Sequence, residues 1–282
     1  MSAPCLARGS SLAALLHCLL LLACGETHVT LLASSASHAG AGGGADASGD
    51  ASADASTPPP LNAAHLVHRY SFDGEGTRVV DSVAAADGSL ESGAVLDGAG
   101  HVTLDGVDDY VNLPNGLVSG LTDATLIAWL AWSGGPCWQR VFDFGSTDAG
   151  EDRVGNATSS LFLTPKRCPG TGPATSFTTI DDQFGSVDSD TAFPVLKVST
   201  IAVVVDTTKQ QLRLYAAGEP LGTGKPQSLA RLSDENAWLG RSQWVQDTYL
   251  RGTYDEFRIY DVALGDAELA ALEAAGPDVV KP

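Results

Sequence analysis

This sequence has few basic residues, few helix-forming patterns and few cysteines. Each of these features argues against certain classes of protein. Lys and Arg number 16 against 34 Asp and Glu, which leaves a net charge of -18. A surface of that sign repels phosphate backbones, so we expect no nucleic acid among the partners. Few segments have the periodicity of an amphipathic helix, which argues against a helical protein.

Glycine, in contrast, is abundant in this sequence. The chain has 31 glycines and only one Met, and its apolar segments are short and rich in Val, Leu and Thr. This composition is typical of an all-β protein with many tight turns. Only 266–274 has a helical pattern, with an acidic first turn and a Gly-Pro stop after it.

The first 23 residues have the pattern of a signal peptide. Arg8 provides a basic start, and Leu12 to Leu22 form an apolar core that is too short to span a bilayer comfortably. The core ends in Leu21-Leu22-Ala23-Cys24, which resembles the bacterial lipobox, in which the cysteine thiol accepts the lipid. An ordinary secretory peptide with an incidental cysteine is the alternative. The lipobox predicts a chain anchored to a membrane leaflet through acyl chains on Cys24.

The sequence after the anchor divides into a tether, one domain and a short tail. Residues 24–62 are dominated by Ala, Ser, Gly and Asp and close in a run of three prolines, so they cannot bury enough apolar surface to fold. From 63 to 276, short segments with period-two alternation recur between turn signals, as an antiparallel sandwich requires. The segment 198–205 is apolar on both faces and is expected to be a central strand. Residues 277–282 form the tail.

Several blocks, taken in order over about 66–274, resemble the laminin G-like jelly roll of the concanavalin A-like lectin and glucanase superfamily. They are His68-Arg69-Tyr70-Ser71-Phe72-Asp73-Gly74, then Asp105-Gly106-Val107-Asp108-Asp109-Tyr110-Val111, Leu212-Arg213-Leu214-Tyr215, Trp238-Leu239-Gly240-Arg241, and Tyr254-Asp255-Glu256-Phe257-Arg258-Ile259-Tyr260-Asp261. The resemblance implies an all-β, antiparallel two-sheet jelly-roll sandwich with a short C-terminal helix. Ser199-Thr200 depart from it, because relatives often have a Trp-His pair there.

Catalytic patterns are absent from the sequence. Glycanases of this superfamily use two carboxylates on one strand in an E-x-D-x-x-E pattern, and none occurs here. Adjacent acids such as Asp255 and Glu256 would point to opposite faces of a strand and could not flank one bond. Zinc-binding, phosphate-binding and nucleophile-elbow motifs are also missing. The sequence therefore predicts a protein that is not an enzyme.

Calcium is the one cofactor that we consider, because loop carboxylates and carbonyls are the ligands it takes. The resemblance places the first and last strands side by side, so Asp73 and Asp255 are the candidate ligands. Solvated or turn-capping acids are the alternative.

Two further expectations concern Cys137, Cys168 and Trp244. The two cysteines are the only ones after residue 24, and a pair in an exported domain indicates a disulfide, with buried free thiols as the alternative. Trp244 lies in a polar segment and could stack on a sugar ring, although such a side chain is more often packing.

Together these observations predict a non-catalytic binding module, displayed at the bacterial cell envelope by a lipid anchor, that binds carbohydrate or a surface protein. Loops at one rim of the sandwich would form the site. A structural or adhesive envelope lipoprotein without a small ligand is the second possibility, and a diverged glycan hydrolase or lyase is the third.

Overall fold

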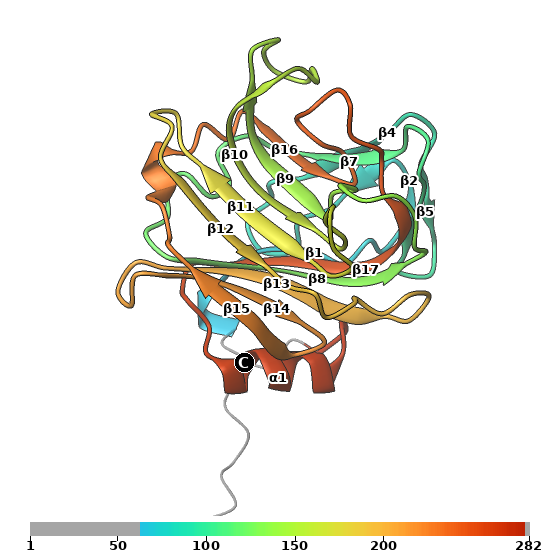
Figure 1. The fold of residues 1–282 in the computed structure, drawn as a ribbon. Helices are drawn as coiled ribbons and strands as arrows, with labels where there is room; N and C mark the ends of the chain where they lie inside the picture. Colours follow the sequence, from blue (N-terminus) through green and yellow to red (C-terminus); the bar gives the residue numbers. More distant parts are fainter. Residues whose placement is uncertain (1–62, 280–282) are drawn as a thin grey trace, which may run out of the picture. The chain divides into compact units, whose positions relative to one another are not determined.

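A computed structural model describes residues 63–279, and these residues form two antiparallel β-sheets packed face to face (Figure 1). The all-β, two-sheet jelly-roll sandwich expected from the sequence is confirmed. The predicted signal peptide 1–23, with Cys24, and the rest of the tether to residue 62 lie outside the described residues. In the part of the chain that the structure describes, no helix is both long and apolar enough to span a membrane.

The first sheet has nine strands in the order β15-β14-β13-β8-β17-β6-β5-β2, with β1 paired to β17 beside β6. Its members are β1 Leu66–Tyr70, β2 Glu75–Gly76, β5 Leu96–Asp97, β6 Val102–Asp105, β8 Ala124–Trp132, β13 Ser199–Asp206, β14 Gln211–Ala216, β15 Glu219–Gly224 and β17 Arg251–Tyr260. Strand β13 lies between β8 and β14 and is buried throughout, so the segment predicted as a central strand is one. The first and last strands also pair as expected.

The second sheet has eight strands in the order β12-β11-β10-β9-β16-β7-β4-β3. Its members are β3 Arg78–Val79, β4 Gly88–Glu91, β7 Tyr110–Leu113, β9 Phe142–Thr147, β10 Ala157–Thr164, β11 Ala174–Thr178, β12 Phe184–Asp188 and β16 Asn236–Leu239. Strand β16 joins β7 to β9, so segments more than a hundred residues apart in the sequence form the middle of this sheet.

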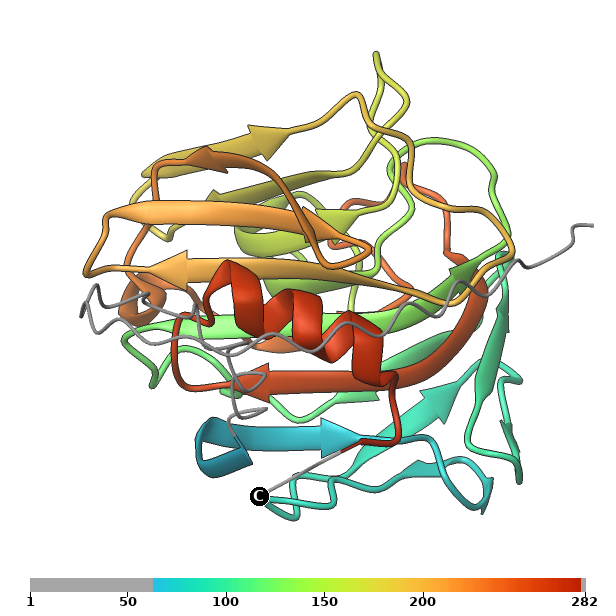
Figure 2. The same ribbon diagram turned by 90° about the horizontal axis from the view of Figure 1, so that it is seen from below.

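The two sheets differ in what covers their outer faces. Between them lies the main core, formed by alternate residues of both sheets. The outer face of the nine-stranded sheet is covered by helix α1 (Asp266–Ala275), whose Leu269 and Leu272 pack on Trp129 and Tyr215. Figure 2 shows α1 lying over the strands of this sheet and running roughly along them. Within residues 63–279, no helix covers the outer face of the eight-stranded sheet.

Strand boundaries were predicted less well than strand identity. Alternation in the sequence predicts a strand from about Gln139, but strand β9 begins at Phe142, a few residues after a turn in which Trp138 has a φ of 66°. Strands β2, β3, β4, β12 and β15 were not predicted from the sequence. Strands β2 and β3 have only two residues each, which leaves little alternation to detect. Two single-turn 3-10 helices, η1 (Ala63–His65) and η2 (Leu229–Arg231), complete the described elements.

The predicted disulfide is present. Cys137 and Cys168 are bonded, and their Cα atoms are 5.7 Å apart. Strands β9 and β10 pair antiparallel, so the segments before β9 and after β10 meet at the same end of the sheet. The bridge therefore fixes the loop that leads into β9. Residues of β9 reach the outer face of the eight-stranded sheet.

Candidate binding groove

One row of side chains crosses the outer face of the eight-stranded sheet. At least one chain neighbour of each member is buried in the core, so alternation turns the member outward. The cross-strand partners in this row are, in order, Ser89, Asn112, Trp238, Asp143, Phe162 and Ser176. The row offers hydroxyl, amide, carboxylate and aromatic groups on one surface.

The middle of the row is covered by the loop that follows β16. The guanidinium of Arg241 lies 4.1 Å from the Trp238 ring centroid. The backbone N–H of Gln243 donates to Asp143 Oδ2 at 3.0 Å. The Trp244 ring packs edge-on against Phe162 at 5.7 Å between centroids. This loop closes the centre of the face and leaves the Ser89 and Asn112 end open.

Asp143 is fully buried beneath this loop. Its Oδ2 accepts from Arg140 Nε at 3.1 Å, while its Oδ1 has no hydrogen-bond partner among the described residues. Burial raises the pKa of Asp143 to about 7, even though Arg140 opposes the shift. The Arg140 guanidinium also lies 4.1 Å from the Phe162 ring centroid and bonds Asp247 at 2.7 Å. The side chains on the covered part of the face are thus bonded to one another.

The open end of the row is a groove of about 400 Å³. Strands β4 and β7 form its floor, and the hairpin between β9 and β10 forms one wall with Glu151 and Asp152. The side chains that line it are polar, and they are Asp87, Ser89, Asn112, Asn115, Glu151 and Asp152, with Gly88, Leu113 and Pro114 between them.

Two amides in the groove are paired with two carboxylates. Asn112 Nδ2 donates to Asp152 Oδ1 at 3.0 Å, and Asn115 Nδ2 donates to Glu151 Oε1 at 2.6 Å. Each pair still has a second carboxylate oxygen and a second amide N–H for a ligand. Sugar hydroxyls donate and accept at once, so adjacent carboxylates and amides fit them. The groove can therefore hold a polyhydroxylated molecule.

Asp87 closes the groove beside Ser89. It accepts from the backbone N–H of Asp81 at 2.9 Å and forms an ion pair with Arg78. The Asp81 N–H and the Arg78 guanidinium hold the pKa of Asp87 below its usual value. The side chain is thus an ionised acceptor at neutral pH.

A second cavity lies at the rim of the sandwich, where the sequence predicts a site. Its volume is about 330 Å³, and Gln139, Thr248 and Arg251 contribute to its lining. The Gln139 amide already has hydrogen-bond partners within the protein, because its Oε1 accepts from Trp132 Nε1 and its Nε2 donates to the Tyr249 carbonyl. The Gln139 amide is therefore not free to bind a ligand in this cavity.

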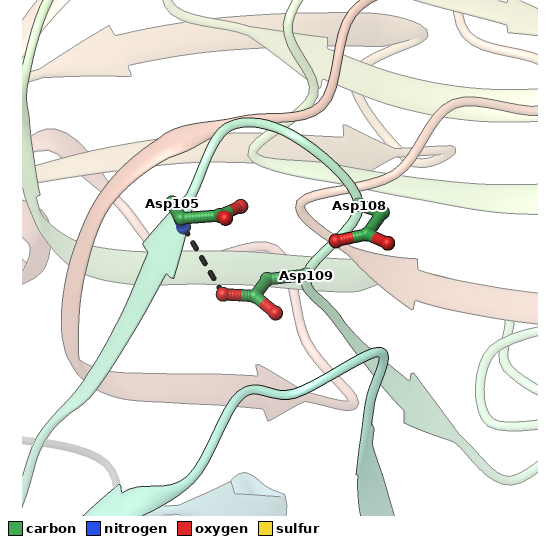
Figure 3. A group of neighbouring side chains, drawn as sticks. All are labelled: Asp105, Asp108 and Asp109. Atoms are coloured by element: carbon green, nitrogen blue, oxygen red, sulfur yellow. Dashed lines mark hydrogen bonds between the residues drawn. The ribbon is translucent and has the colours of Figure 1, made fainter.

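Beside the rim cavity, three carboxylates converge. One oxygen each from Asp105, Asp108 and Asp109 lies within 4.8 Å of the others. Figure 3 shows them around the turn from β6 to β7, with the backbone N–H of Asp105 donating to Asp109. Burial, and then the Asp105 charge, raise the pKa of Asp109. Oxygen donors of this kind suit calcium.

The structure separates the two predicted calcium ligands from this group. Asp73 is exposed and accepts from Ser71 Oγ at 2.7 Å. Asp255 lies on β17, where its Oδ1 is 3.7 Å from His101 Nε2, and burial raises its pKa. Their role as calcium ligands stays a prediction.

Trp244, the predicted sugar-stacking residue, is half-buried in the covering loop and does not line the groove. Its role in ligand binding also stays a prediction. The groove residues themselves were not predicted. Alternation around Val111 and Leu113 could have placed Asn112 on the outer face, but the approach of Glu151 and Asp152 depends on how the hairpin folds over.

The sequence also identifies the family to which this chain belongs. A family model described as the concanavalin A-like lectin/glucanases superfamily matches residues 105–270, more than half of the chain. The chain belongs to this superfamily. The match includes β7 of the groove floor, the hairpin with Glu151 and Asp152, and the covering loop, but not β4, which precedes residue 105. A search of the curated proteins finds no match.

Solved structures with the same fold include domain 4 of an extracellular arabinanase from Geobacillus stearothermophilus, in complex with arabinotriose. It is 19% identical, with a TM-score of 0.57, over 74% of this chain and 98% of that one. A Trypanosoma rangeli sialidase in complex with sialic acid is 17% identical, with a TM-score of 0.53, over 73% of this chain and 32% of that one. The binding domain of botulinum neurotoxin serotype D is 12% identical, with a TM-score of 0.56, over 76% of this chain and 52% of that one. At these identities the likeness shows the shared fold, and this chain spans a third to a half of the last two.

Proposed function

We propose that this superfamily member is a carbohydrate-binding module and that the groove on the outer face of its eight-stranded sheet is the binding site. The observation that carries the proposal is the pair of amide–carboxylate couples, Asn112 with Asp152 and Asn115 with Glu151, which face one groove. Sheet faces that lack a covering helix can accept an extended chain such as an oligosaccharide. The arabinotriose complex of a domain with the same fold supports this class of ligand.

The proposal includes no catalytic step. A general acid needs a raised pKa, whereas the pKa of Asp87 is lowered by the Asp81 N–H and by Arg78. The carboxyl with a pKa of about 7, Asp143, is buried under the covering loop and cannot reach a glycan. Incubation of the purified chain with a bound glycan should therefore release no new reducing ends.

The test of binding is a glycan screen followed by titration calorimetry on a retained glycan. Asn115→Trp should fill the groove and abolish binding, because Asn115 is exposed and lines it. Thr248→Trp is the matched control, since Thr248 is equally exposed but lines the rim cavity. Retention of no glycan would contradict the proposed function, and loss only in Thr248→Trp would move the site to the rim.

We also propose that Cys24 is lipidated and holds the domain at the bacterial cell envelope. The lipobox pattern supports this, and the Cys137–Cys168 disulfide fits an oxidising compartment. Replacement of Cys24 by Ser should move the chain from the membrane fraction to a soluble one outside the cytoplasm. Unchanged membrane association would contradict the anchor.

A further inference from the structure

The charge of the groove indicates more than a preference for sugars, provided that the groove is the proposed carbohydrate site. Asp87, Glu151 and Asp152 line it, and no Lys or Arg is among the described residues that do. Glu151 and Asp152 form no ion pair within residues 63–279, and their printed side-chain partners are neutral amides. Two full negative charges therefore remain for a ligand to neutralise.

The nearby guanidinium groups do not line the groove. Arg153 follows Asp152 in the chain and is exposed, but it is not among the lining residues. Arg78 is already paired with Asp87. Arg241 is 8% exposed, and its guanidinium is stacked between the rings of Trp238 at 4.1 Å and Tyr110 at 4.5 Å. Its Nη2 donates to the backbone carbonyl of Asp152 at 3.3 Å, not to the carboxylate. Arg241 thus supports the groove wall from behind without lining the groove.

We infer that the groove selects oligosaccharides whose sugars have free amino groups. Ammonium groups donate charge-assisted hydrogen bonds to carboxylates, and these are roughly twice as strong as bonds between neutral partners. Sugar hydroxyls next to each amine would occupy the free amide groups of Asn112 and Asn115. Uronic acids and sulfated sugars would be repelled by the same carboxylates. The net charge of -18 also attracts cationic glycans toward the protein.

Titration calorimetry with three tetramers tests this inference. They are a glucosamine tetramer, the same tetramer with every amine acetylated, and a galacturonic acid tetramer. At about pH 6, amines are protonated and carboxylates ionised. We expect the amino tetramer to bind about tenfold more tightly than the acetylated one, as two surface ion pairs allow. This advantage should shrink as salt rises from about 0.1 M to 1 M, because the Debye length falls from about 10 Å to 3 Å. The acidic tetramer should not bind.

Two variants of equal charge separate the groove from general attraction to an acidic protein. Glu151→Gln with Asp152→Asn removes two groove charges and should abolish the preference for the amino tetramer. Asp105→Asn with Asp108→Asn removes two charges at the rim, outside the groove, and should leave the preference intact. Thermal unfolding of both variants confirms that they are folded.

The possible results distinguish failure of the amino-sugar inference from failure of the proposed carbohydrate-binding function. Equal loss in both variants would overturn the inference, because binding would then follow net charge alone. Equal affinity for the amino and acetylated tetramers would also overturn it while leaving carbohydrate binding in place. If no tetramer binds but the glycan screen retains another sugar through the groove, the amino-sugar inference fails and the proposed function stands.

Discussion

The backbone N–H of Asp152 donates a 2.7 Å hydrogen bond to Oδ1 of Asn236, and this bond joins the groove wall to the middle of the sheet. Asn236 is fully buried, and its Nδ2 donates to Gln243 Oε1 at 3.0 Å. Gln243 Nε2 in turn donates to the Asp143 carbonyl at 3.2 Å. Asp152 has a φ of 58°, a left-handed conformation that Asp adopts more readily than most non-glycine residues. Asn236 therefore positions Asp152.

Replacement of Asn236 by Ala should lower both stability and groove affinity. The change leaves the buried Gln243 oxygen without its donor, which costs about 1–3 kcal/mol of unfolding free energy. It also releases the Asp152 backbone, so the carboxylate no longer stays beside Asn112. Urea unfolding and glycan titration measure the two effects.

Asn115→Ala is the control for that variant. Asn115 is exposed, so its loss should change the unfolding free energy by less than about 0.5 kcal/mol. Affinity should still fall, because Glu151 loses its amide partner. If Asn236→Ala bound glycan with unaltered affinity, Asn236 would not position Asp152 for binding.

Sequence alternation predicted most of the long strands because each has one face in the core. Val111 and Leu113 point inward, and Leu212 and Leu214 do the same in β14. The disulfide could be predicted for a similar reason, since antiparallel pairing of β9 and β10 brings Cys137 and Cys168 to one end. Local pattern and simple topology were sufficient for these features.

The groove could not be predicted in this way. Its side chains come from separate segments, at Asp87, Asn112 and Glu151 among others, and no spacing in the sequence relates them. The covering loop poses the same problem, because the position of Trp244 depends on packing against Phe162. Contacts between distant segments depend on the folded geometry of hairpins and loops, which alternation does not encode.

Removal of the disulfide should destabilise the domain without changing its fold. The bridge links residues 31 positions apart, and in the chain-entropy model its loss lowers the unfolding free energy by about 4 kcal/mol, because the unfolded chain gains conformational entropy. For a domain of this size that corresponds to a fall in melting temperature of roughly 10 °C. Calorimetry on the Cys137→Ala, Cys168→Ala variant checks this. A shift below about 2 °C would contradict the model.

Calcium should raise the melting temperature, because an ion that binds only the native state stabilises it. We expect the rise to depend on the three carboxylates that converge at the turn from β6 to β7, where the ion would relieve their repulsion. Asp108→Asn should therefore abolish the rise, whereas Asp73→Asn should not. The reverse pattern would place the ion at Asp73 and Asp255, and no rise in the unmodified chain would exclude both placements.

Stability should fall as pH rises toward neutrality because of Asp143. The pKa of this carboxyl is about 7 in the folded chain and about 4 when unfolded, so the folded state binds more protons between these values. Its favourable contribution is complete below about pH 4 and is lost as pH rises through about 7. The total change is on the order of 4 kcal/mol.

Asp143→Asn tests this dependence, because Asn cannot ionise and Arg140 keeps its 2.7 Å bond to Asp247. Urea unfolding of both proteins between about pH 4 and 8 should give a difference in stability that changes in favour of the variant as pH rises. Other carboxyls cancel in the comparison. Asp81, whose pKa is lowered chiefly by the hydrogen bond to His68 against the effect of burial, loses its contribution as pH falls in both proteins. A pH-independent difference between the two proteins would mean that Arg140 keeps Asp143 ionised throughout.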